Sequence, residues 1–331
     1  MKPGKDLLDG IIDLAQCQQK KSNNPKPLSK VERRAIDTGT AIVMVPPEQI
    51  AYQHTVLCQT SMPYRNPGQN IRVWDREQGA VSLRINAGDA KNPETGEWVE
   101  LGLPFGPKPR LILAHLNAEA LKTGSPVIEM DDSLTAFVRR IQNMSGKAKS
   151  GPNGHEIRAF KDHLGRLAAS IIRMALAKDG YAFQVDSKVV TAFDLWFPKN
   201  EHQRVLWPST IQLSQDYFTS LQNHAVPLDE RALGGLSHSA MALDIYAWLA
   251  QRLHRTPLGR PQFIPWPTVK DQFGQGYKEL KFFRRTFRKV LAQVLTLYPA
   301  AKLDEDSCGL TLRNSPPPVT KRMLLVNKPV K

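Results

Sequence analysis

The stretch YKELKFFRRTFRKVLAQVLTLYP, residues 277–299, predicts one long amphipathic helix with two chemically different faces. At about 100° per residue, its apolar side chains gather on one side of the helical wheel, and these are Phe283, Phe287, Val290, Leu291, Val294 and Tyr298. Its cations gather on the other side, and these are Lys278, Lys281, Arg284, Arg285, Arg288 and Lys289. The apolar face is typical of a helix packed on a core, whereas the cationic face has only Glu279 close by in sequence.

A helix face of a single charge sign is unusual, because solvated faces mix signs that support each other at i,i+4. Like charges repel unless an anion meets them, and the obvious anion for a cytosolic protein is nucleic acid. The whole chain is also basic, with 45 Lys and Arg against 31 Asp and Glu and a net charge of +14. Two interpretations are open: a surface that contacts DNA, or the solvated face of a generally basic protein.

Composition argues against several classes of protein. A length of 331 residues suggests about two domains. The cysteines Cys17, Cys58 and Cys308 are far apart and form no CxxC pair, so we expect neither a disulfide framework nor a zinc site. The chain has no apolar run of about 18 residues, the length that a membrane span needs, and its first residues are too polar for a signal peptide. We therefore expect a cytoplasmic protein that does not enter a membrane.

The two ends of the chain are predicted to be less ordered than its middle. Residues 1–50 include a Lys/Asn/Pro/Ser-rich stretch at 20–30, which indicates a flexible N-terminal segment. Residues 316–331, PPPVTKRMLLVNKPVK, indicate a basic flexible tail. Strand-like patterns cover residues 54–65 and 71–86, and the second of these is a hairpin that turns around Gln78-Gly79.

Residues 51–200 predict a first helix-turn-helix arrangement. Helices are expected at 109–122, 131–141 and 155–168. Strands are expected at 127–130, 169–177 and 181–197. The last two strands are joined at Asp179-Gly180, a favoured hairpin dipeptide. Helix, strand, helix, helix and hairpin is the order of a winged-helix domain.

The order recurs in residues 201–315. Helices are expected at 215–223, 239–254, 268–273 and 277–299. Strands are expected at 209–214, at 263–266 and in a terminal hairpin around Cys308-Gly309. The predicted fold class is therefore α+β, with two winged-helix domains in tandem. Residues 51–200 form the first, whose early strands offer a surface for a homodimer, and residues 201–315 form the second, which carries the main DNA-recognition helix.

Several blocks of the chain carry a family resemblance. They are LGLPFGPKPRLILAHLNAEALKTGSPVIEM (101–130), DDSLTAFVRRI (131–141), AFDLWF (192–197), LWPSTIQLSQDYF (206–218), AVPLDERALGGLSHSAMALDIYAWLAQRL (225–253), IPWPTVKDQFG (264–274) and the run Tyr-Pro-Ala-Ala at 298–301. In their order and spacing these blocks resemble plasmid replication initiators of the RepA type.

The resemblance implies a bacterial protein that binds repeated sites, called iterons, in the double-stranded DNA of a plasmid origin. Such initiators help to melt adjacent AT-rich DNA and recruit the host replication initiator and the replicative helicase. They often repress their own gene as dimers and act at the origin as monomers, which bears on plasmid copy control. Structurally characterised iteron-binding relatives have two winged-helix domains.

In the second domain, the helix at 277–299 is the expected recognition helix. The third helix of a winged helix enters the major groove with its N-terminal half toward the bases. The cations expected nearest to base edges are therefore Lys278, Lys281, Arg284 and Arg285. Those expected to meet phosphates are Arg288 and Lys289. On the terminal hairpin, Lys302 and Arg313 are candidates for contact with the minor groove or the DNA backbone.

The first domain has a weaker cationic signal, because acidic residues are interleaved with its basic ones. Its candidates for DNA contact are Arg139, Arg140, Lys147, Lys149, Arg158, Lys161 and Arg166. Glu156 and Asp162 share the helix of the last three. The alternative is a domain used for packing or dimerisation, with an ordinary mixed surface.

Known catalytic motifs do not fit the sequence, so we expect no catalytic residue, metal or cofactor. Gly146-Lys147 is followed by Ala148 rather than Ser or Thr, which excludes the usual P-loop. HEIRAFKDH at 155–163 does not match HExxH, the zinc-binding motif of metalloproteases. The sequence also lacks a His-x-His pair, which argues against a nickase. Asp131-Asp132 precedes a predicted helix and fits an N-cap better than a metal site. A winged-helix transcriptional repressor is the alternative to an initiator, and a DNA-nicking enzyme is a third hypothesis.

Overall fold

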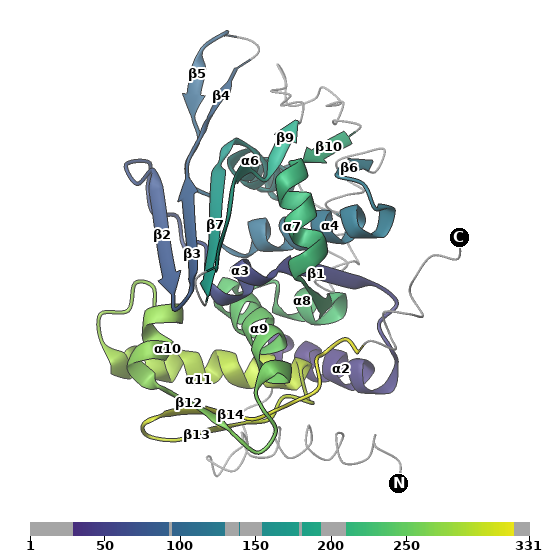
Figure 1. Ribbon diagram of the computed structural model, residues 1–331, viewed down its shortest axis with the longest axis vertical. Helices are drawn as coiled ribbons and strands as arrows, with labels where there is room; N and C mark the ends of the chain where they lie inside the picture. Colours follow the sequence, from purple (N-terminus) through teal and green to yellow (C-terminus); the bar gives the residue numbers. More distant parts are fainter. Residues whose placement is uncertain are drawn as a thin grey trace. The chain divides into compact units, whose positions relative to one another are not determined.

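The computed structural model describes residues 29–92, 95–129, 139, 154–178, 181–192 and 210–320. Over these residues the chain forms two compact units (Figure 1). The first unit lies between residues 52 and 225, and the second combines residues 29–51 with residues 226–320. Each unit contains helices and antiparallel strands, which confirms the α+β class expected from the sequence.

A four-stranded antiparallel sheet provides much of the core of the first unit. Its order is β2 (Val73–Gln78), β3 (Val81–Asn86), β7 (Ile171–Lys178) and β8 (Tyr181–Lys188). The β2–β3 hairpin turns at Gly79, as predicted, with a φ of 59° that side chains disfavour. Leu83 and Ile85 on β3 and Ile172 and Met174 on β7 alternate with more exposed residues and are buried. One face of the sheet therefore closes a core.

Helices α4 (Pro107–Thr123) and α6 (Gly154–Ala169) pack against each other in the same unit. α4 has proline in its first turn and ends at Gly124, whose φ of 68° forms a left-handed C-cap. A second antiparallel sheet has the order β6 (Val127–Glu129), β10 (Thr210–Leu213) and β9 (Val190–Ala192). The unit also contains α3 (Thr55–Gln59), α7 (Gln215–His224) and a hairpin of β4 (Asp89–Lys91) and β5 (Trp98–Glu100). The chain passes between the units within β1 (Ile50–His54) and β11 (Ala225–Asp229).

The segment 54–65 was expected to be a strand, and that prediction is wrong. His54 ends β1 and is the N-cap of α3, because its Nδ1 atom accepts a hydrogen bond from the amide of Val56 at 3.2 Å. Histidine is not among the usual N-cap residues. The short helix therefore gave no recognisable start signal in the sequence.

The boundary expected between residues 200 and 201 also differs from the structure. β10 pairs with both β6 and β9, and α7 contacts α4, so residues 210–225 belong to the first unit. The long strand expected at 181–197 is divided into β8 and β9, and its residues beyond 192 lie outside the described part. Of the helix expected at 131–141, only residue 139 is described.

Two buried histidines of the first unit predict a loss of stability in acid. Burial, with a smaller effect from His224, lowers the pKa of His54 from 6.5 to about 3. Burial, with a smaller effect from Lys108, lowers the pKa of His163 from 6.5 to about 4. Both histidines stay neutral in the folded chain while the unfolded chain takes up protons. As the pH falls from 6.5 toward 4, each should reduce the free energy of unfolding by up to about 1.4 kcal/mol per pH unit.

Urea unfolding at a series of pH values measures this slope. The double variant with His54→Asn and His163→Gln is the comparison, because asparagine keeps an N-cap acceptor and neither new side chain titrates. The variant should show a shallower dependence on pH than the natural chain. Equal slopes for both proteins would contradict the assignment to these histidines.

The second unit holds the elements expected for residues 239–315 in the expected order. Its helices are α8 (Glu230–Leu236), α9 (Ala240–Arg252), α10 (Trp266–Phe273) and α11 (Leu280–Leu297), with a short 3-10 turn η1 (Leu253–Arg255). An antiparallel sheet has the order β12 (Gln262–Pro265), β14 (Gly309–Leu312) and β13 (Leu303–Glu305). α9 is buried along nearly its whole length. It is the central core helix of this unit.

Residues 29–51 carry a helix that the sequence did not predict. α2 (Lys30–Met44) starts with a capping box, in which the Ser29 hydroxyl accepts from the Glu32 amide and the Glu32 carboxylate accepts from the Ser29 amide. The helix packs against α8 and α11. Arg231 donates hydrogen bonds to the carbonyls of Ala41 and Val45 at its end. The expectation of a flexible segment is therefore wrong for residues 30–44, while residues 1–28 lie outside the described part.

The C-terminal tail was expected to start at residue 316, but the next few residues are packed. The Tyr298 hydroxyl donates to the carbonyl of Pro316 at 2.7 Å, and Val319 is fully buried. The rest of the predicted tail, residues 321–331, lies outside the described residues.

Gly39 lets α2 approach α11 closely, and this predicts a large effect of a side chain there. A Cβ atom at Gly39 would collide with the backbone carbonyl oxygen of Thr296. Gly39→Val should therefore separate the helices and lower the free energy of unfolding by about 1–3 kcal/mol. The control is Asp37→Val, an exposed position on the same helix, and urea denaturation measures both. Equal stability of the two variants would contradict this packing.

Candidate nucleic-acid interface

The apolar stripe of α11 is buried much as the sequence indicated, although the helix is shorter than expected. It runs from Leu280 to Leu297 rather than over 277–299, with Glu279 as its N-cap. Its buried residues are Phe283, Phe287, Leu291, Val294 and Leu297. Lys278 lies just before the helix, where its carbonyl accepts a hydrogen bond from Lys270 at 3.1 Å. No acidic residue occupies the first turn.

Trp266, the first residue of α10, is the centre of the core beneath this helix. Its ring is 1% exposed and meets the rings of Phe283 and Phe287 edge-on, at centroid distances of 6.5 and 5.7 Å. Its Nε1 atom donates to the carbonyl of Asp306, between β13 and β14, at 3.1 Å. The indole thus ties α10, α11 and the terminal hairpin together.

Two arginines of α11 also lie over the Trp266 ring. The guanidinium carbons of Arg284 and Arg288 are 5.1 and 5.6 Å from its centroid. Both distances are in the range of a cation–π contact. The Nε atom of Arg284 is buried without a hydrogen-bond partner. The indole therefore fixes the positions of two cations that the sequence assigned only to a helix face.

Arg288 has a counter-ion that sequence reasoning missed. It forms an ion pair with Glu305 at the end of β13, so the cationic face has a carboxylate beside it. Arg313, a candidate on the hairpin, pairs with Asp304 at 2.6 Å. Lys302 is exposed. The two carboxylates lie on the hairpin, and only the folding of the chain brings Glu305 to α11.

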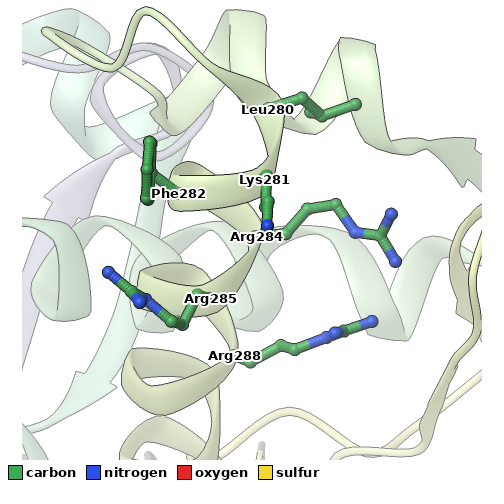
Figure 2. A pocket seen from close by; sticks show the side chains of 6 residues that line it. All are labelled: Leu280, Lys281, Phe282, Arg284, Arg285 and Arg288. Carbon is green, nitrogen blue, oxygen red and sulfur yellow. The ribbon is translucent and has the colours of Figure 1, made fainter.

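The remaining cations of α11 point into solvent. Lys281, Arg285 and Lys289 are exposed and form no ion pair with any described residue. Figure 2 shows Lys281 between two groups, with Arg284 and Arg288 on one side of the helix and Phe282 and Arg285 on the other. A hollow of about 630 Å³ on this surface is lined by Leu280, Lys281, Phe282, Arg284, Arg285 and Arg288. The first half of α11 is thus an open cationic surface.

The candidates in the first unit are less favourably placed. Arg166 is held within the unit, with its side chain 11% exposed, paired with Asp162 at 2.8 Å and lying over the Phe105 ring at 5.3 Å. Lys161 is half-buried, and burial lowers its pKa. Arg139 and Arg158 are exposed. Arg140, Lys147 and Lys149 lie outside the described residues.

Within the described ranges, no group of three or more His, Cys, Asp or Glu side chains could hold a metal ion. In the same part of the chain, every helix is too short or too polar to cross a bilayer. The tryptophans Trp248 and Trp266 are buried in the second unit.

Comparison with known proteins found a match to one family. Residues 103–266 match the family described as plasmid encoded RepA protein, which confirms the resemblance expected from the sequence. The matched segment ends at the start of α10, so α11 lies beyond it. No curated protein matches the chain.

The comparison with solved structures found two crystal structures. One is the crystal structure of selenomethionine derivatives of domains 2 and 3 of RctB, with 6% identity, a TM-score of 0.46, and coverage of 78% of this chain and 97% of that one. The other is the crystal structure of RctB domains 2–3, with 8% identity, a TM-score of 0.46, and coverage of 78% and 96%.

Proposed function

We propose that this protein, whose residues 103–266 form a domain of the plasmid RepA family, is a replication initiator that binds repeated sites in double-stranded origin DNA. The observation that carries the proposal is the first half of α11, an exposed cationic surface that an aromatic core holds in place. Neutralising phosphates with such cations supplies most non-specific affinity for DNA.

The second unit is proposed to be a winged-helix domain. Three helices, α9, α10 and α11, together with the sheet β12–β14–β13, follow one another in the order of that fold. In this assignment α11 is the recognition helix and β13–β14 is the wing. The Arg288–Glu305 ion pair links the two. For the first unit, a winged-helix arrangement remains a proposal from the sequence.

The positions of the side chains suggest different roles for the cations. Lys281 and Arg285 are exposed in the first two turns of α11, where a recognition helix faces the bases. Arg284 was expected at a base edge, but its contact with Trp266 favours a fixed position facing a phosphate. Phosphate contacts are also proposed for Lys278 and Lys289, for Lys302 on the wing, and for Arg139 and Arg158 in the first unit.

Further steps of initiation are proposed from the family resemblance alone. They are melting of AT-rich DNA beside the repeats, recruitment of the host replication initiator and helicase, and autorepression by a homodimer. None requires the protein to catalyse a reaction, because binding energy and wrapping can deform DNA.

A plasmid replication assay tests the proposed function. A vector without its own origin, carrying the DNA that flanks this gene, should replicate in a bacterial host only when the protein is supplied. Replication without the protein would contradict the initiator role. Failure to replicate, together with repression of a reporter through one palindromic operator, would favour the transcriptional repressor. Cleavage of supercoiled plasmid in the presence of Mg²⁺ would favour a nicking enzyme, and we expect none.

Glu305 is expected to restrain non-specific binding, because it competes with phosphate for Arg288. Glu305→Gln should strengthen binding to random duplex DNA and steepen its salt dependence by about one unit of slope. Glu77→Gln is the matched control, since it makes the same charge change at an exposed position of the first unit. Fluorescence anisotropy at several salt concentrations measures both variants. If the two behave alike, total charge rather than this ion pair sets the affinity.

A further inference from the structure

Phe282 is an exposed aromatic residue within the cationic surface of α11. Its side chain is 44% exposed, although its neighbour Phe283 is fully buried in the core. It lies in the first turn of the helix, directly after Lys281. An aromatic ring in water lacks the stabilisation that burial provides. Packing in the core of its own unit therefore does not account for the exposed position of this ring.

The groups around Phe282 indicate which kind of partner would cover it. The guanidinium carbon of Arg285 is 5.4 Å from the ring centroid, which orients ring and cation together. Figure 2 shows both on the same side of the helix, away from Arg284 and Arg288. The same hollow is lined by four cations. A surface with this charge favours a polyanion over an apolar protein partner.

We propose that Phe282 contacts the 5-methyl group of a thymine in the major groove, beside the base that Arg285 contacts. The inference rests on the proposed function, because it requires α11 to enter the major groove. The thymine methyl group is the apolar feature of the base edges in that groove, and phenylalanine is among the side chains that meet it. Phe282 then adds recognition of thymine to the hydrogen bonding of its cationic neighbours.

Deoxyuridine lacks only this methyl group and provides the test. In the duplex that the natural protein protects in footprinting, each thymine is replaced singly by deoxyuridine, and Kd is measured by fluorescence anisotropy. At one position per repeat, the replacement should weaken binding by the natural protein about fourfold, the effect of one buried methyl group. The same replacement should leave binding by Phe282→Ala unchanged.

Phe263→Ala is the matched control, because Phe263 is 50% exposed but lies on β12, outside α11. It should keep the fourfold effect of the natural protein. The inference is overturned if no deoxyuridine position affects the natural protein, or if Phe282→Ala keeps the same sensitivity. If the natural protein neither protects DNA in footprinting nor binds any duplex, the proposed function itself fails.

Discussion

Replacing Lys281, Arg284, Arg285 and Arg288 together by alanine is expected to flatten the salt dependence of DNA binding by about three to four units of slope. Each cation that meets a phosphate or displaces counterions contributes about 0.9 to that slope. Affinity for the specific site should also fall by about 30-fold or more, because Lys281 and Arg285 are proposed to contact bases at about 1–3 kcal/mol each. Plots of log Kd against log salt concentration for the natural and variant proteins measure both effects.

A control with the same charge change separates this surface from the general basicity of the chain. Four exposed cations of the first unit, none of them a candidate for DNA contact, are replaced by alanine: Arg65, Lys91, Lys122 and Lys188. This control should keep most of the natural slope. Circular dichroism of both variants checks that each is folded. Equal losses in the two variants would show that the cationic face of α11 is merely solvated.

Trp266→Ala is expected to have the largest effect on stability. The indole is buried against Phe283 and Phe287, so its truncation should lower the free energy of unfolding by about 3–5 kcal/mol. The variant also removes the ring over which Arg284 and Arg288 lie. Urea denaturation measures the loss of stability.

Two further variants make this prediction specific. Trp98→Ala removes a tryptophan that is 72% exposed, and such a change should alter stability by less than about 0.5 kcal/mol. Trp266→Phe keeps an aromatic ring and should retain the fold with weakened DNA binding, because the ring beneath both arginines becomes smaller. A Trp266→Ala protein as stable as Trp98→Ala would contradict the placement of this core.

The course of α11 could be predicted from the sequence because its apolar residues repeat at helical spacing and its cations fill the opposite face. The terminal hairpin could be predicted for a similar reason, since Cys308-Gly309 separates two strand-like runs. Neither sequence pattern shows which residues far apart in the chain come into contact. The contacts of Arg288 with Glu305 and of both arginines with Trp266 exist only once the chain has folded.

Other parts of the fold were missed for identifiable physical reasons. α2 has a capping box at Ser29 and Glu32, but its place next to a Lys- and Pro-rich stretch made the whole segment look flexible. The first unit ends later than expected because β10 pairs with β6, a strand far away in sequence. Such pairing depends on tertiary structure and leaves no local pattern.

Footprinting on the DNA that flanks this gene tests whether α11 recognises repeated origin sites. The natural protein should protect an array of evenly spaced direct repeats beside an AT-rich tract. The variant with Lys281, Arg284, Arg285 and Arg288 replaced by alanine should lose that protection at equal concentration. Absence of protected repeats with the natural protein, or full protection by the variant, would contradict the claim that α11 recognises repeated origin sites.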